Sequence, residues 1–171
     1  MILKMKKLFL ITIILLLQSF PSFGNPNGKG IICKCEEVQK CPKSGHLFHN
    51  SYITKEEIPS EIGIIFEKNY ATTYYIIIIN DKISLLKEPK KYGGKYSFRS
   101  TEDIISWNEN YGNNISVNRK TLIYKLKDNM FKKTYFRKCK SYNSDQLIKE
   151  MLNLVKFHQN NYNKRLSDNK I

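Results

Sequence analysis

The sequence predicts a mainly β protein: an antiparallel meander of about seven or eight strands, barrel-like or half-barrel in form, followed by one C-terminal amphipathic helix. Short stretches rich in β-branched and aromatic residues alternate with turn residues between positions 31 and 139. The connections between them are too short for parallel crossovers, so successive strands must be antiparallel. After position 142 apolar residues recur at three- and four-residue spacing, which is typical of a helix.

The chain opens with a segment that has the outline of a signal peptide. Lysines precede an apolar run from Leu8 to Leu17, and Pro21 with small residues up to Gly24 follows the run. The run is too short to span a bilayer comfortably. We therefore expect residues 1–24 to be a cleaved leader and the remaining chain to be secreted or periplasmic, with no transmembrane span. An uncleaved membrane anchor is the alternative.

The strands can be placed one by one from composition and turn residues. The run TTYYIIII, residues 72–79, is apolar nearly throughout, which indicates burial on both of its faces. Asn80 and Asp81 supply a turn, so the next strand returns as a hairpin partner. The expected strands are 31–35, 62–66, 72–79, 82–86, 95–100, 103–107, 115–117, 121–126 and 130–139, with a short extended piece at 46–53.

Three further parts follow the leader. We expect a disulfide-linked β domain over residues 25–141, a helix over 142–160 packed on the sheet, and a flexible tail over 161–171. Asn143 and Ser144 are suitable helix caps. The apolar stripe of the helix is what packing on a sheet requires, and a basic amphipathic helix on a membrane surface is the alternative.

The charge favours anionic partners. The chain carries a formal net charge of +14, and loss of the three lysines of the leader lowers it to +11. A field of this size attracts anionic polymers or an envelope surface. Lysine greatly outnumbers arginine, however, as in a protein encoded by AT-rich DNA, so the charge has a compositional explanation as well. A dedicated phosphate site more often uses arginine.

Aromatic and cationic residues interleave in two stretches, 92–99 and 131–137. Such interleaving suits a surface that combines stacking with charge. The predicted anion or ligand surface consists of Lys95, Arg99, Lys132, Lys133 and Arg137, with Trp107 as the wall of a pocket. The alternative is ordinary strand alternation, with lysine outward and Trp107 in the core.

Three of the four cysteines lie in the stretch CKCEEVQKCPKSGHLFH, which begins at Cys33. An even number of cysteines in an exported chain indicates disulfides. Cys33 and Cys35 are too close in sequence to pair without strain. Two pairings remain, in which one of these two cysteines joins Cys41 and the other joins Cys139. We favour Cys35 with Cys41 across a local loop and Cys33 with Cys139, which ties the first strand to the last.

A metal site is the other interpretation of this stretch. Zinc takes four ligands, which Cys33, Cys35 and Cys41 with His46 or His49 would supply, although the spacing is not that of a common zinc motif. A small secreted hydrolase that uses one of these histidines is a second alternative. We expect no catalytic residue and no cofactor, since the sequence has no phosphate loop, nucleophile elbow or paired metal-binding histidines.

The stretch IISWNENYGNNISVNRKTLIYKL, which begins at Ile104, and the stretch GKGIICKC, which begins at Gly28, carry a resemblance. The chain resembles small exported β-rich bacterial proteins of unassigned function, a group that implies no activity. In size and in its disulfide between distant strands it is also similar to the β-barrels that inhibit lysozyme in the periplasm. Many lysozymes are basic, so a net charge of +11 opposes that function. The sequence therefore predicts an exported, non-enzymatic binding or structural module.

Overall fold

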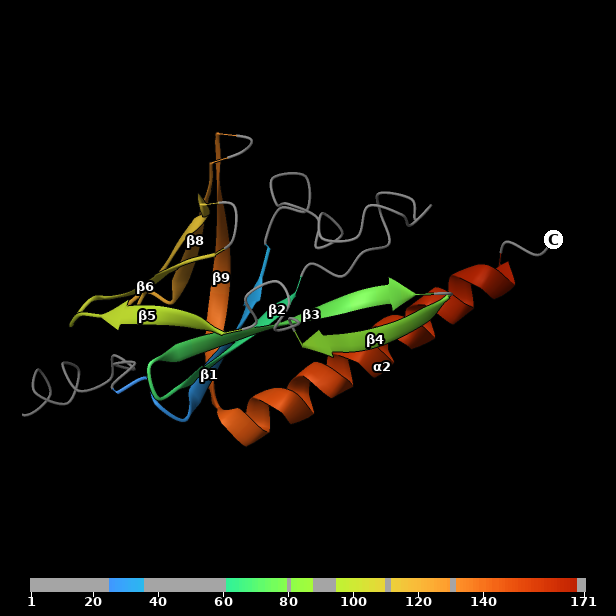
Figure 1. Ribbon diagram of the computed structural model, residues 1–171. Coiled ribbons are helices and arrows are strands. Elements are labelled where there is room, and N and C mark those ends of the chain that lie inside the picture. Colours follow the sequence, from blue (N-terminus) through green and yellow to red (C-terminus); the bar gives the residue numbers. More distant parts are fainter. Residues whose placement is uncertain are drawn as a thin grey trace, which may run out of the picture.

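The computed structural model describes residues 25–35, 61–79, 81–87, 95–109, 112–129 and 132–168. Within these residues nine strands form one antiparallel sheet and one helix follows them (Figure 1), which confirms the predicted class. The elements are β1 (Lys29–Lys34), β2 (Ile62–Glu67), β3 (Tyr70–Ile79), β4 (Lys82–Lys87), β5 (Tyr96–Ser100), β6 (Ile104–Asn108), β7 (Asn114–Asn118), β8 (Ile123–Asp128), β9 (Lys133–Asn143) and α2 (Ser144–Asp168). The extended piece expected near 46–53 lies outside the described residues.

Eight strands close into a barrel in the order β2-β1-β9-β8-β7-β6-β5-β3, and pairing of β3 with β2 completes the ring. Strand β9 exchanges neighbours along its length. Its first half pairs with β8, from Lys133 to Lys138, and its second half pairs with β1, from Lys138 to Asn143. This stagger is the shear that a closed barrel requires.

The ninth strand, β4, lies outside the barrel. It pairs with the C-terminal half of β3, so these two strands leave the barrel as the predicted hairpin and run alongside α2 (Figure 1). Ile76, Ile77 and Ile78 are all buried. Burial on both faces of this strand, predicted from its unbroken apolar run, is thereby confirmed.

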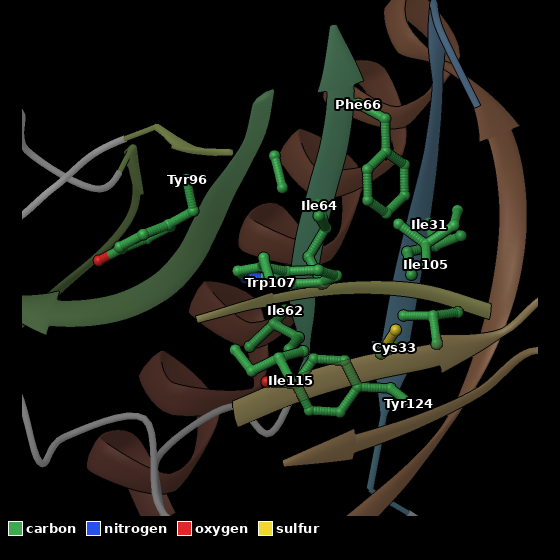
Figure 2. Packing of buried hydrophobic residues seen from close by; sticks show 12 residues of the cluster. Ile31, Cys33, Ile62, Ile64, Phe66, Tyr96, Ile105, Trp107, Ile115 and Tyr124 are labelled. Atoms are coloured by element: carbon green, nitrogen blue, oxygen red, sulfur yellow. The ribbon is translucent and has the colours of Figure 1, made fainter. Parts of the chain in front are cut away.

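Aromatic rings fill the middle of the barrel (Figure 2). Phe66 packs edge-to-face on Phe98 and on Trp107, with ring centroids 5.4 and 5.9 Å apart, and Trp107 meets Tyr124 at 6.4 Å. Figure 2 shows Trp107 among Ile62, Ile64 and Tyr124. An eight-stranded barrel is wide enough for side chains to fill its interior, so this part of the molecule is a packed core.

A second core lies between the outer surface of the sheet and α2. Leu147 and Met151 of the helix are fully buried against the outward side chains of β1, β2 and β3. Glycines allow this close approach. A Cβ on Gly30 would lie 2.8 Å from the carbonyl oxygen of Ile64, and one on Gly63 would lie 3.1 Å from the sulfur of Met151. The predicted packing of the helix on the sheet is therefore correct.

The helix differs from its predicted bounds. Strand β9 continues to Asn143, the helix begins at Ser144, and it extends to Asp168 instead of ending at 160 before a flexible tail. Polar contacts to the β3–β4 hairpin hold the C-terminal part of the helix, around and beyond the predicted end. Gln159 accepts a hydrogen bond from the backbone N–H of Ile83 at 2.7 Å, and the Tyr162 hydroxyl donates to Asp81 at 2.6 Å. Such polar contacts produce no apolar periodicity in the sequence, so the apolar pattern did not predict the helix beyond residue 160.

One predicted disulfide is confirmed. Cys33 and Cys139 are direct neighbours across β1 and β9, with their Cα atoms 4.0 Å apart, and they form a disulfide. Cys35 is also disulfide-bonded. Its predicted partner, Cys41, lies outside the described residues.

Candidate functional site

The outward side of three neighbouring strands, β8, β9 and β1, gathers lysines. Successive side chains of a strand point to opposite faces, so inward Tyr124 and Arg137 alternate with outward lysines. The strand register places Lys138 beside Lys34. We call the set the lysine face: Lys34, Lys125, Lys127, Lys138 and Lys140, all of them exposed.

No carboxylate occupies an outward position on the described residues of these three strands. Two aromatic rings lie among the lysines. Lys125 stands 5.9 Å from the ring centroid of Phe136, and Lys140 stands 5.6 Å from that of Tyr142. Phe136 is 57% exposed although it is large and apolar. The face thus presents positive charge and an accessible aromatic ring together, which suits an anionic ligand.

At its β1 end the lysine face borders a groove beside α2, with a volume of about 670 Å³. This volume falls within the range of roughly 300–1,000 Å³ that small-molecule sites occupy. Residues of both cores and of the lysine face line it: Ile32, Lys34, Cys35, Glu61, Lys138, Cys139, Lys140, Tyr142, Glu150 and Leu154.

A buried carboxylate fixes one end of the groove. Glu61 lies 3.2 Å from Nε2 of His158 on α2 and 3.6 Å from the ammonium of Lys34 on β1. Burial by itself raises the pKa of the Glu61 carboxyl. The hydrogen bond and charge of His158, a backbone hydrogen bond and the charge of Lys34 lower that pKa, and the net result lies below the usual value. Glu61 therefore joins helix and barrel as an anion.

We expect Glu61→Gln to destabilise the fold at neutral pH by about 1–3 kcal/mol, because it removes a charged hydrogen-bond acceptor from a buried position. A lowered folded-state pKa contributes stability above the unfolded pKa, near 4.3 for glutamate, and this contribution disappears as the pH falls through the folded value. The difference in thermal stability between the two proteins should thus narrow between about pH 5 and pH 3.

Thermal unfolding followed by circular dichroism across this pH range measures the effect. Glu102→Gln, at an exposed position, controls for the loss of one negative charge. A difference for Glu61→Gln that stays constant down to pH 3 would contradict an anionic Glu61 at the helix contact.

Only some residues of the predicted anion surface are exposed. Lys95, Arg99, Lys132 and Lys133 are exposed, but they lie on or beside β5, in the turn before β9 and at the first residue of β9, away from the centre of the lysine face. Arg99 shares a register row with Lys125, and Ser106 and Ser116 separate the two. The predicted surface contains none of the five lysines of the lysine face, although the two-residue period along β9 was a signal for Lys138 and Lys140.

Arg137 and Trp107 are buried, so the prediction that they belong to an exposed surface is wrong. The alternative considered for Trp107, a position in the core, is confirmed. Trp107 is 3% exposed and Arg137 is 4% exposed, and both belong to strands whose inward positions fill the barrel. The alternation along β9 explains the error, since Arg137 has the same parity as inward Cys139. Burial lowers the pKa of Arg137, while Tyr124, Tyr75 and Glu61 act in the opposite direction. An arginine keeps its charge even so, and this cation belongs to the barrel interior.

The structure removes two ligands from the metal alternative. Cys33 and Cys35 are disulfide-bonded and present no thiolate to zinc. Cys41, His46 and His49 lie outside the described residues. Among the residues that are described, no three histidine, cysteine or acidic side chains cluster closely enough to hold a metal ion.

In the part of the chain that the structure describes, no helix has the long apolar stretch that crossing a bilayer requires. Comparison of the chain with protein-family models, with curated proteins and with solved structures finds no match in any of the three.

Proposed function

We propose that this chain is an exported, non-enzymatic binding module whose lysine face binds an anionic ligand, such as a polymer of the cell envelope. The observation that carries the proposal is the register of β1, β9 and β8, which turns lysines scattered along the sequence into one exposed surface. Positive charge concentrated on one face attracts a polyanion more strongly than the same charge spread evenly.

The disulfides support the exported location. Cys33 pairs with Cys139, and Cys35 is bonded too. Such bonds persist in oxidising compartments outside the cytosol. The leader predicted for residues 1–24 agrees with this location.

The test compares two variants of equal charge. One replaces Lys125, Lys127, Lys138 and Lys140 by alanine, and the other replaces Lys82, Lys149, Lys156 and Lys164, which are exposed on β4 and α2. A fluorescent single-stranded dT oligonucleotide serves as the polyanion, because the salt dependence of such binding has a known scale. Fluorescence anisotropy is measured at salt concentrations from about 20 to about 200 mM, where the screening of charges by salt changes strongly. It gives the affinity for the oligonucleotide and the slope of log affinity against log salt.

We expect the lysine-face variant to lose about tenfold or more in affinity and its slope of log affinity against log salt to become shallower by up to about 3. The control variant should lose far less. Equal losses in both variants would mean that only the net charge of the chain matters. Binding by the wild type that does not change with salt would exclude the proposal altogether.

A further inference from the structure

The groove beside α2 has two walls of different character. The strand wall comes from β1, β9 and the residue that follows β1, and the helix wall comes from Glu150 and Leu154 of α2. Apolar surface lies between them: Ile32 is 7% exposed, and Tyr142 and Leu154 are half-buried. An aliphatic chain placed here would leave water and contact side chains on both sides.

Positive and negative charges lie on different sides of the groove. Lys34, Lys138 and Lys140 all stand on the strand wall. Glu61 already holds His158 and Lys34 at one end of the groove, and Glu150 stands on the helix wall. An anionic group that approaches the strand wall therefore meets lysine ammonium groups, and an apolar group continues between β1 and α2.

We infer that the groove binds a long-chain carboxylate, with its aliphatic chain along Ile32 and Leu154 and its carboxylate at Lys138 and Lys140. The inference rests on the proposed function in that it takes the lysine face to bind anions. It adds an apolar requirement that a simple polyanion does not meet. The volume of about 670 Å³ suits one aliphatic chain within the usual size of ligand sites.

The test uses dansyl-undecanoate, a fluorescent fatty acid, and its uncharged methyl ester. Leu154→Trp should fill the groove, whereas Leu152→Trp places the same side chain two residues away at a position that is 46% exposed. Fluorescence titration should show that Leu154→Trp weakens fatty-acid binding by roughly tenfold or more. Leu152→Trp should leave the affinity within about twofold of the wild type, because it changes no residue of the groove.

A second variant tests the inference even if Leu154→Trp does not fold. Lys140→Gln changes an exposed side chain and should reduce the preference of the protein for the acid over its methyl ester by roughly fivefold or more, because one charge partner is lost. Equal affinity of the wild type for acid and ester, or equal binding by both Trp variants, would overturn the inference.

The dT titration separates this result from that of the proposed function. Leu154→Trp should keep its oligonucleotide affinity, because the substitution leaves all five lysines of the lysine face in place. If the oligonucleotide binds as expected and the fatty acid does not, the ligand class is wrong and the proposed function stands. If the lysine-face variant binds the oligonucleotide as well as its control does, the proposed function fails independently of the groove.

Discussion

Replacing both Cys33 and Cys139 by alanine lowers the free energy of unfolding by about 4–5 kcal/mol, as expected from the chain entropy that their disulfide removes from the unfolded state. The two residues are 106 positions apart, so the bond closes almost the whole barrel into one loop. In the folded state β1 and β9 also pair directly as antiparallel strands. The variant should therefore reach the same fold with less stability.

Urea unfolding of four samples isolates this contribution: wild type and variant, each oxidised and reduced. Reduction of the variant reports only the disulfide of Cys35. Reduction should lower the free energy of unfolding more in the wild type than in the variant, and this difference measures the Cys33–Cys139 disulfide. It contains no contribution from cavities left by the alanine substitutions. The dependence of the unfolding free energy on urea should also steepen, because an unfolded chain without the long loop closure exposes more surface. A difference below about 1 kcal/mol would show that the bond constrains the unfolded chain little.

Most of the strands could be predicted from the sequence because local chemistry determines them. The β-branched run of β3 and the turn at Asp81 give the β3–β4 hairpin. Asp81 adopts the left-handed conformation that this turn needs, with φ of 60°. Closure of the barrel is different, since it depends on the pairing of β2 with β3 and on the stagger of β9, and neither leaves a local signal.

The turn between β7 and β8 shows how side-chain chemistry differs from backbone preference. Asparagine often adopts positive φ itself in a turn, and we expected the next strand to start at Thr121. Instead the Asn118 side chain accepts hydrogen bonds from the backbone N–H groups of Lys120 and Thr121, and Leu122 is the residue with positive φ. Strand β8 then begins at Ile123. An asparagine favours both arrangements, so the sequence does not distinguish them.

The candidate site could be predicted only in part, because it is a product of register. Within β8 the sequence places Lys125 and Lys127 opposite Tyr124, and the structure confirms this alternation. That Lys138 lies beside Lys34 depends on the pairing of the first strand with the last. Proximity in sequence was misleading for Arg137, whose neighbours Phe136 and Lys138 face outward while it lies inside the barrel.

Trp107→Ala should lower the free energy of unfolding by about 3–5 kcal/mol, the usual cost of removing a large ring from a packed core. Trp107 is 3% exposed and joins Phe66 to Tyr124 by edge-to-face contacts across the barrel interior. No neighbouring strand can move inward to fill the space, because each is paired on both sides around the ring. Much of the cavity should therefore remain, which places the cost in the upper part of this range.

Trp107→Phe is the matched control, because it keeps an aromatic ring and removes the indole nitrogen. Nε1 of Trp107 is buried and forms no hydrogen bond with the described residues. Its removal sacrifices no such bond, so the cost should be limited to lost volume, about 1–2 kcal/mol. Both variants lack the tryptophan whose fluorescence would report unfolding. Urea unfolding is therefore followed by circular dichroism.

The same Phe variant decides between the two roles considered for this residue. A core residue affects ligand binding only through stability, so folded Trp107→Phe should bind the dT oligonucleotide like the wild type. Binding that weakens tenfold or so in a variant of nearly unchanged stability would assign Trp107 to a ligand site inside the barrel. That result would move the site from the outward side of β8 and β9 to the interior, where Arg137 supplies the buried cation.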